Sequence, residues 1–182
     1  MNYTVFNDII QNIHHQKIRD FTVACLEIAN PELNEMPAAS SGKYHPKECC
    51  EPGGLVKHIR RACFFANMLM QAYKFDAENP GGDVVYSALL LHDIAKKSSY
   101  KNEPQFAYVN HPVEATNIIK AKRELVPEPI FNCISNCVKF HMGPWTPKFA
   151  QKPMNQYTFL ELMVYNCDFL SSRKELIIDV QK

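Results

Sequence analysis

The sequence predicts an all-α fold, a single helical bundle that forms one domain. Apolar residues recur at three- and four-residue steps in several long segments, and no segment alternates polar and apolar residues as a half-buried strand does. At 182 residues the chain has the length of one ordinary domain, and it shows no internal repeat. We therefore expect helices packed around one core, with any small-molecule site lying between the central helices.

The periodicity divides the domain, 1–182, into three parts. Residues 1–29 are expected to form one or two amphipathic helices, whereas residues 30–54 carry four prolines and three glycines and are interpreted as a long substrate loop. The helical core follows over 55–176. Its helices are expected from Gly53–Gly54 to about Phe75, from Val84 to about Lys96 with Asp83 as N-cap, from His111 to about Leu125, from Ile130 to Phe140, and from about Tyr157 to Leu176.

Composition argues against several classes of function. The chain has 20 Lys and Arg against 19 Asp and Glu, so it has no long-range field to attract a nucleic acid, and we expect no extended nucleic-acid surface. Its apolar runs are far shorter than the roughly 20 residues that span a bilayer, which predicts no membrane partner. Seven irregularly spaced cysteines without a secretory leader predict reduced thiols and a cytoplasmic location. Apolar residues of the helix over 3–29 could serve a homodimer interface.

The segment 89–96, Leu-Leu-Leu-His-Asp-Ile-Ala-Lys, dominates the chemistry of the chain. An apolar run brings His92 and Asp93 into the interior, and Lys96 follows three residues after the carboxylate. Burying a carboxylate costs several kcal/mol unless something pairs with it, and a divalent metal ion is an economical partner. Further candidate ligands lie inside or at the edge of apolar helical segments: His58, His111, His141 and Asp168.

All six candidate ligands are imidazole or carboxylate side chains. This set favours iron, manganese, cobalt, nickel or zinc, with iron or manganese preferred, over calcium or magnesium and over a structural thiolate zinc site. Six ligands are too many for one catalytic ion that must keep an open position, so we expect two divalent ions that share Asp93. Such a centre would attract phosphate and acidify bound water toward hydroxide at neutral pH.

The order of these ligands resembles the binuclear branch of the HD superfamily of metal-dependent phosphohydrolases, over residues 53–173. The resemblance implies that His58, the pair His92-Asp93 and Asp168 hold one metal ion. It implies that Asp93 bridges to a second ion held by the two remaining histidines, and that Lys96 contacts a substrate phosphate. Mononuclear members of the superfamily keep only the first histidine, the His-Asp pair and the last aspartate. The number of bound ions, one or two, therefore remains open.

The loop before the first ligand carries a second resemblance. Its centre, Pro-Ala-Ala-Ser-Ser-Gly-Lys-Tyr-His-Pro over 37–46, is similar to uncharacterised HD proteins of phages and prokaryotes and, more loosely, to bacterial HD-type 3′-5′ exoribonucleases. The candidates for a substrate-facing wall are Ser41, Lys43, Tyr44 and His45. Because no Gly-Tyr-Pro signature follows and no oligonucleotide-binding domain precedes the core, a cyclic-di-GMP phosphodiesterase and an exonuclease are disfavoured. Trp145, close to His141, could stack on a base or plug the end of its helix.

Three functions are compatible with these residues. The leading hypothesis is hydrolysis of a phosphoester or phosphoanhydride bond in a small, nucleotide-type substrate by metal-activated hydroxide. Asp93 would hold the catalytic ions, while Lys96 and loop residues such as Lys43 or His45 would neutralise developing charge. The alternatives are an HD-type di-iron oxygenase, which shares the ligand set, and a non-catalytic nucleotide-binding module. The sequence leaves the substrate, the metal and the oligomeric state open.

Overall fold

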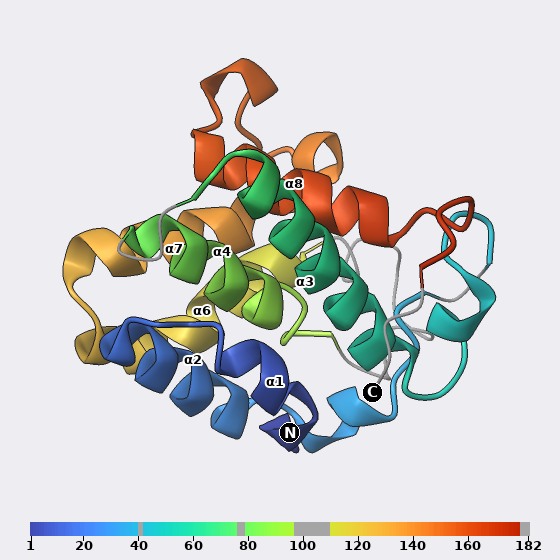
Figure 1. Cartoon of the computed structure of the whole chain (residues 1–182), viewed down its shortest axis with the longest axis horizontal. Helices are drawn as coiled ribbons and strands as arrows, with labels where there is room; N and C mark the ends of the chain where they lie inside the picture. The colour runs from blue at the N-terminus through green and yellow to red at the C-terminus, as the bar shows by residue number, and fades with distance from the viewer. Residues whose placement is uncertain (40–41, 76–78, 97–109, 179–182) are drawn as a thin grey trace.

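The computed structural model describes residues 1–39, 42–75, 79–96 and 110–178, in which the regular secondary structure is helical and no strand occurs (Figure 1). The α-helices are α1 (Asn7–Ile10), α2 (Gln16–Ile28), α3 (Gly54–Ala72), α4 (Pro80–Leu91), α6 (His111–Ile119), α7 (Glu128–Phe140) and α8 (Phe159–Ser171). Short 3-10 turns are η1 (Tyr3–Phe6), η2 (Pro31–Asn34), η3 (Lys47–Cys49), η5 (Lys120–Leu125), η6 (Gly143–Trp145) and η7 (Met154–Gln156). The predicted all-α bundle is confirmed.

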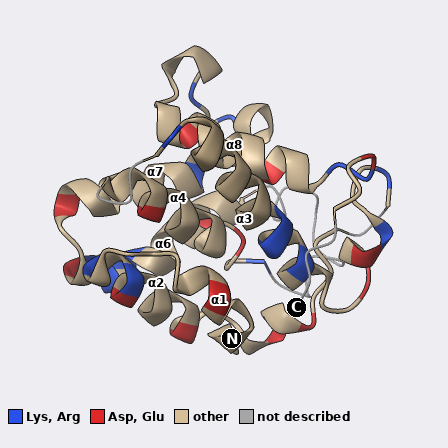
Figure 2. Cartoon of the chain, viewed as in Figure 1, with Lys and Arg blue, Asp and Glu red and all other residues tan. Residues whose placement is uncertain are grey.

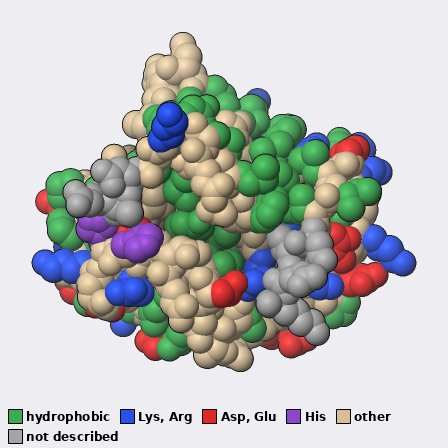
Figure 3. Space-filling view, in the orientation of Figure 1, with side chains coloured by type: hydrophobic (Ala, Val, Ile, Leu, Met, Phe, Trp, Pro, Cys, Tyr) green, Lys and Arg blue, Asp and Glu red, His purple; other side chains and the backbone are tan. Residues whose placement is uncertain are grey.

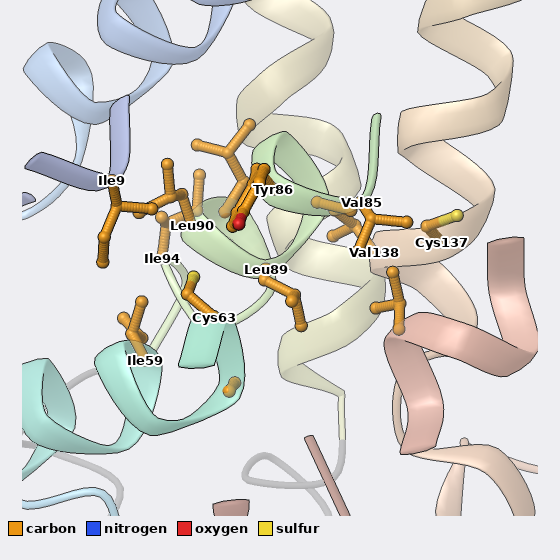
Figure 4. Packing of buried hydrophobic residues seen from close by; sticks show 14 of the residues in the cluster. Ile9, Ile59, Cys63, Val85, Tyr86, Leu89, Leu90, Ile94, Cys137 and Val138 are labelled. Atoms are coloured by element: carbon orange, nitrogen blue, oxygen red, sulfur yellow. The ribbon is translucent and has the colours of Figure 1, made fainter. Parts of the chain in front are cut away.

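Helix α4 lies at the centre of the bundle, packed against α2, α3, α7 and α8 (Figure 1). Its residues from Val84 to Leu91 are all buried, as expected of a helix that is apolar on nearly every side. Figure 4 shows its side chains surrounded by residues of three other helices. The labelled neighbours are Ile9 of α1, Ile59 and Cys63 of α3, and Cys137 and Val138 of α7. The segment that follows α4 therefore emerges inside the core.

Helix α3 begins at the predicted glycine pair and ends at Ala72, three residues before the expected Phe75. Gly53 is the N-cap and has a φ of +75°, a conformation that side-chain-bearing residues rarely adopt. A Cβ atom at Gly54 would collide with the backbone of Cys49. Two glycines in succession thus allow the turn η3 to pack directly against the first turn of α3, and His58 lies in the next turn of this helix.

The predicted bounds of α4 are wrong at both ends. Asn79 is the N-cap and accepts the N–H of Gly81 at 2.9 Å, with Pro80 at the first helical position, a stronger start than the expected Asp83. Asp83 instead accepts the backbone N–H groups of His14 and His15, at 3.1 and 2.7 Å, and so satisfies donors just before α2. At the other end the helix stops at Leu91. His92, Asp93 and Lys96 consequently lie in the turn after α4 and not on it.

Other predicted boundaries differ less. Helix α8 ends at Ser171, five residues before the expected Leu176, and the helix that starts at His111 continues through η5 to Leu125 as expected. The loop over 30–54 contains the two turns η2 and η3, and its residues 40–41 lie outside the described residues. All seven cysteines are free.

The surface carries charges of both signs without segregation into one acidic and one basic face, as Figure 2 shows for one side of the molecule. On the same side, hydrophobic side chains gather over α3 and α8 (Figure 3). Exposed large hydrophobic residues on these two helices include Phe64, Met68 and Phe159. No helix in the described part of the chain is long and apolar enough to cross a membrane.

Candidate metal centre

The six predicted ligands lie together in one buried cluster, although five elements supply them. His58 comes from α3, His92 and Asp93 from the turn after α4, His111 from the first position of α6, His141 from the position after α7, and Asp168 from α8. The side chains of five of them are almost inaccessible to solvent, whereas that of Asp168 is 20% exposed. Within the described residues, the ligand atoms of His58, His92 and Asp168, which we call the first group, are close enough to one another to hold a metal ion. The same holds for the ligand atoms of His92, Asp93 and His141.

The first group surrounds one carboxylate oxygen of Asp93. Oδ2 of Asp93 lies 3.2 Å from Nε2 of His92 and 3.7 Å from Nε2 of His58. Oδ1 of Asp168 lies 3.0 Å from Nε2 of His58 and 3.6 Å from that of His92. The two Nε2 atoms are 3.4 Å apart. Four side chains thus present two nitrogens and two oxygens to one point.

The second group, which we define as His111 and His141, surrounds the other oxygen of the same carboxylate. Oδ1 of Asp93 lies 3.0 Å from Nε2 of His111 and 3.8 Å from Nε2 of His141. These two nitrogens are 3.1 Å apart. Asp93 therefore stands between two pairs of imidazoles, with one oxygen directed at each pair. This is the arrangement expected of a carboxylate that bridges two metal ions.

Two of the imidazoles are oriented by the ends of their own helices. His92 and His141 are the C-cap residues of α4 and α7. In each, Nδ1 lies 2.7 Å from the backbone carbonyl oxygen three residues earlier, that of Leu89 and that of Val138. A carbonyl oxygen can only accept, so the proton resides on Nδ1 and Nε2 faces the cluster. Metal-binding histidines are commonly oriented in this way.

A side chain rather than a carbonyl orients His58. Its Nδ1 lies 3.0 Å from Oγ of Ser171, and that hydroxyl donates to the backbone carbonyl of Asp168 at 2.7 Å. Because the hydroxyl proton is used, the serine oxygen accepts from Nδ1–H of His58. Nε2 of His58 is then left with its lone pair directed at Asp168 and Asp93. Ser171 is fully buried and was not among the residues predicted from the sequence.

The charges of the cluster are strongly coupled. Burial alone would raise the pKa of the Asp93 carboxyl, but the neighbouring His92 and Lys96 hold that pKa well below its usual range. Burial lowers the pKa of His92, and the carboxylate of Asp93 outweighs this effect and raises it. Burial, reinforced by His92, lowers the pKa of His141 to about 3. Two neighbouring imidazoles beside the same carboxylate therefore have pKa values shifted in opposite directions.

The donor atoms fit divalent transition-metal ions. Metal–ligand bonds of about 2.1 Å place neighbouring ligand atoms roughly 3.0 to 3.4 Å apart, and most of the separations in both groups fall near this range. Oδ2 of Asp93 is fully buried without a hydrogen bond of good geometry. Nitrogen and oxygen donors without thiolate suit manganese, iron, cobalt, nickel or zinc. The buried His and Asp side chains can therefore hold metal ions.

Lys96 connects the cluster to the loop over 30–54. Its Nζ lies 2.7 Å from Oδ2 of Asp93 and donates to the carbonyl oxygen of Ala38 at 3.1 Å. The ring of His45 is centred 5.5 Å from that of His58, and burial lowers the pKa of His45 to about 4. The loop thus contacts the cluster at two points.

The remaining predicted substrate-binding residues lie farther out. Tyr44 and Trp145 are half-exposed, and the ammonium of Lys43 lies 5.0 Å from the centre of the Tyr44 ring. Trp145 packs near-parallel to Phe169, the residue after Asp168, with ring centres 6.4 Å apart. Ser41 lies outside the described residues.

Three residues near the cluster were missed from the sequence: Phe169, Ser171 and Arg173. Ser171 lies three residues after Asp168, close to one helical turn, so a search of the same helix face could have found it. Arg173 lies beyond the end of α8, and the local pattern carries no signal for it.

Cavity volume does not identify this cluster. The largest of the described grooves, about 1420 Å³, lies between the N-terminal segment and α3. Its lining includes Val5, Asp8, Val56 and Arg60 and contains none of the six ligands.

No protein-family model matches the chain, and comparisons with curated proteins and with solved structures yield no match.

Proposed function

We propose that this protein is a metal-dependent phosphohydrolase of the HD type, which cleaves a phosphoester or phosphoanhydride bond in a small nucleotide-type substrate. The observation that carries the proposal is the position of Asp93, whose two carboxylate oxygens each face a different pair of imidazole nitrogens. This geometry supports two divalent ions, with iron or manganese favoured by the donor set. The order of the ligands along the chain, which resembles that of binuclear HD proteins, agrees with it.

The six candidate ligands can be assigned to two metal ions. His58, His92 and Asp168 would hold one ion, His111 and His141 the other, and Asp93 both. Divalent ions bound there supply Lewis acidity, which lowers the pKa of water and neutralises phosphoryl oxygens.

Lys96 adds a buried positive charge beside Asp93, and it is held in place by the carbonyl of Ala38. A fixed ammonium at this position stabilises negative charge that develops on a phosphoryl group. The near-complete burial of five of the ligands excludes bulk water from the centre, which strengthens these electrostatic interactions.

The test combines metal content with turnover. The protein is purified anaerobically, loaded with manganese or iron, and analysed for metal by mass spectrometry. It is then mixed with mononucleotides, dinucleoside polyphosphates, cyclic dinucleotides and short oligonucleotides, and the products are separated by chromatography. We expect two ions per chain in the wild type, one in His111→Ala, and neither ion nor turnover in Asp93→Ala.

The outcomes separate the competing functions. Cleavage that is lost in Asp93→Ala supports the phosphohydrolase and identifies its substrate class. Metal loading without cleavage, together with substrate-dependent oxygen uptake that only iron supports, would instead identify an oxygenase. Full cleavage by Asp93→Ala would overturn the proposal.

A further inference from the structure

Aromatic and cationic side chains form a continuous row beside the ligand cluster. The rings of Trp145 and Phe169 are inclined by only 15°, with centres 6.4 Å apart. The guanidinium carbon of Arg173 lies 4.4 Å from the centre of the Phe169 ring and 5.0 Å from that of Tyr44. We call Trp145, Phe169, Arg173 and Tyr44 the rim row. It joins η6, α8 and the loop before α3, three segments far apart in the sequence.

The rim row is attached to the cluster at several points. Phe169 directly follows Asp168, and Trp145 comes four residues after His141. Tyr44 is held to the C-terminal end of α8 because its carbonyl oxygen accepts the backbone N–H of Lys174 at 2.8 Å. Asp168 is the ligand with the most accessible side chain. The row is therefore built from residues that lie next to or near cluster residues in the sequence, beside the ligand whose side chain is the most accessible.

The guanidinium of Arg173 keeps its positive charge available. Its Nε and Nη2 donate to the hydroxyl of Ser172, at 3.2 and 2.7 Å, and its faces pack on two rings. In the parts of the chain that the structure describes, no carboxylate forms an ion pair with it. Lys43 adds a second positive charge, with its ammonium 5.0 Å from the centre of the Tyr44 ring. A guanidinium that is fixed by rings and left without a carboxylate is suited to bind a phosphate group.

Trp145 offers a surface of a different kind at the other end of the row. Its side chain is 58% exposed although one side of the indole packs toward Phe169. An exposed indole beside a catalytic centre can stack on a planar base of any identity. A base platform and a phosphate-binding arginine thus lie along one row.

We propose that the rim row recognises the nucleoside and a phosphate that is not cleaved, with the base on Trp145 and the phosphate on Arg173. This inference rests on the proposed function, because it supplies the substrate class for that centre. It makes nucleoside polyphosphates better ligands than simple phosphomonoesters. Arg173 acts as a specificity-determining residue.

Trp145 is the only tryptophan of the chain, so its fluorescence reports directly on this surface. The manganese-loaded protein is titrated with adenosine, with pyrophosphate and with the α,β-methylene analogue of ADP, whose bridge cannot be hydrolysed. We expect the analogue and adenosine to quench the emission saturably. Pyrophosphate should leave the emission unchanged but compete with the analogue.

Two neighbouring substitutions test the role of Arg173. Arg173→Gln should weaken binding of the analogue about tenfold, since a charge-assisted contact to phosphate is lost, and should leave binding of adenosine unchanged. Lys174→Gln removes the same charge one residue later from an exposed side chain, keeps the backbone contact to Tyr44, and should bind like the wild type. Unchanged binding of adenosine by Arg173→Gln also shows that this variant is folded.

Absence of quenching by the analogue would overturn the inference, as would equal effects of the two substitutions. The result is separable from that of the proposed function. Quenching by the analogue without cleavage of any nucleotide would support nucleotide binding at the rim row and would contradict the proposed phosphohydrolase function. Cleavage of nucleotides without any change in the emission of Trp145 would support the phosphohydrolase function and would contradict the inference about the rim row.

Discussion

For three of the four ligand imidazoles, the hydrogen-bond partner of Nδ1 decides the direction of the ring. His92 and His141 use carbonyl groups at the ends of their helices, where carbonyls lack an intrahelical partner. The hydrogen bond from Nδ1–H therefore satisfies a carbonyl that lacks a partner in the helix, and it directs Nε2 toward the cluster. For His58, in the second turn of α3, the hydroxyl of Ser171 takes this role from another helix.

Removal of the Ser171 hydroxyl should weaken the first metal group without unfolding the protein. In Ser171→Ala, Nδ1–H of His58 loses its acceptor and the ring is free to rotate, so we expect affinity for the first ion to fall by about 10- to 100-fold. Calorimetric titration with manganese measures it.

The adjacent substitution Ser172→Ala is the matched control for metal binding. The Ser172 hydroxyl donates to the carbonyl of Phe169 and accepts from Arg173, and no contact with a ligand of the cluster is described for it. Equal metal affinities in the two variants would show that Ser171 does not orient His58.

At the scale of elements, α8 is anchored at both ends. Its first turn has a capping box, in which the Thr158 hydroxyl accepts the N–H of Glu161 at 3.3 Å and the Glu161 carboxylate accepts that of Thr158 at 2.6 Å. Its last turn is held by Arg61 of α3, a fully buried guanidinium. Nε of Arg61 donates to the carbonyl of Ser171, and Nη2 donates to those of Arg173 and Leu176.

The substitution Arg61→Met should lower the free energy of unfolding by about 3 kcal/mol, because it leaves buried carbonyl groups at the end of α8 without a donor. Chemical denaturation followed by circular dichroism measures the loss. Since Arg61 holds the backbone of Ser171, weaker metal binding should accompany it.

Arg60 provides the comparison for this prediction. Its guanidinium pairs with Asp8, an exposed carboxylate, at 2.7 Å, and such pairs contribute about 1 kcal/mol or less. Arg60→Met should therefore cost clearly less than Arg61→Met. A larger loss from Arg60→Met would mean that the end of α8 does not depend on Arg61.

At the scale of the whole molecule, the candidate ligands bring α3, the turn after α4, α6, α7 and α8 together at one buried cluster. An ion that binds only the folded state stabilises it by mass action, by about 2.7 kcal/mol per site when the free ion is at 100 times its Kd. Loading with manganese should therefore raise the denaturation midpoint. A chelator should reverse the rise.

The variant Asp93→Ala distinguishes specific binding from a general effect of manganese. It lacks the carboxylate that both ligand groups share, so its denaturation midpoint should not respond to the metal. An equal response in wild type and variant would show that manganese acts elsewhere on the protein.

Much of the fold followed from local pattern. A three- and four-residue apolar repeat places residues on one face of a helix whatever the rest of the chain does, so α3, α7, α8 and the helical segment formed by α6 with η5 were predicted within five residues. Helix α2 lies in the N-terminal segment that was expected to form one or two helices, without separate bounds. The bounds of α4 were harder to predict from the sequence. Its sequence is apolar on all sides and has no periodic face, and Asp83 makes its contacts with His15, 68 residues away.

The sequence by itself determined the all-α class and which ionisable side chains occupy apolar helical segments, because both depend on near neighbours along the chain. Only the tertiary structure decided that Asp93 directs one oxygen at each pair of imidazoles, that Ser171 orients His58 across 113 residues, and that Arg173 stands between two rings. These arrangements join segments that meet only when the helices pack. Their geometry is set by the packing of the core, which no short stretch of sequence contains.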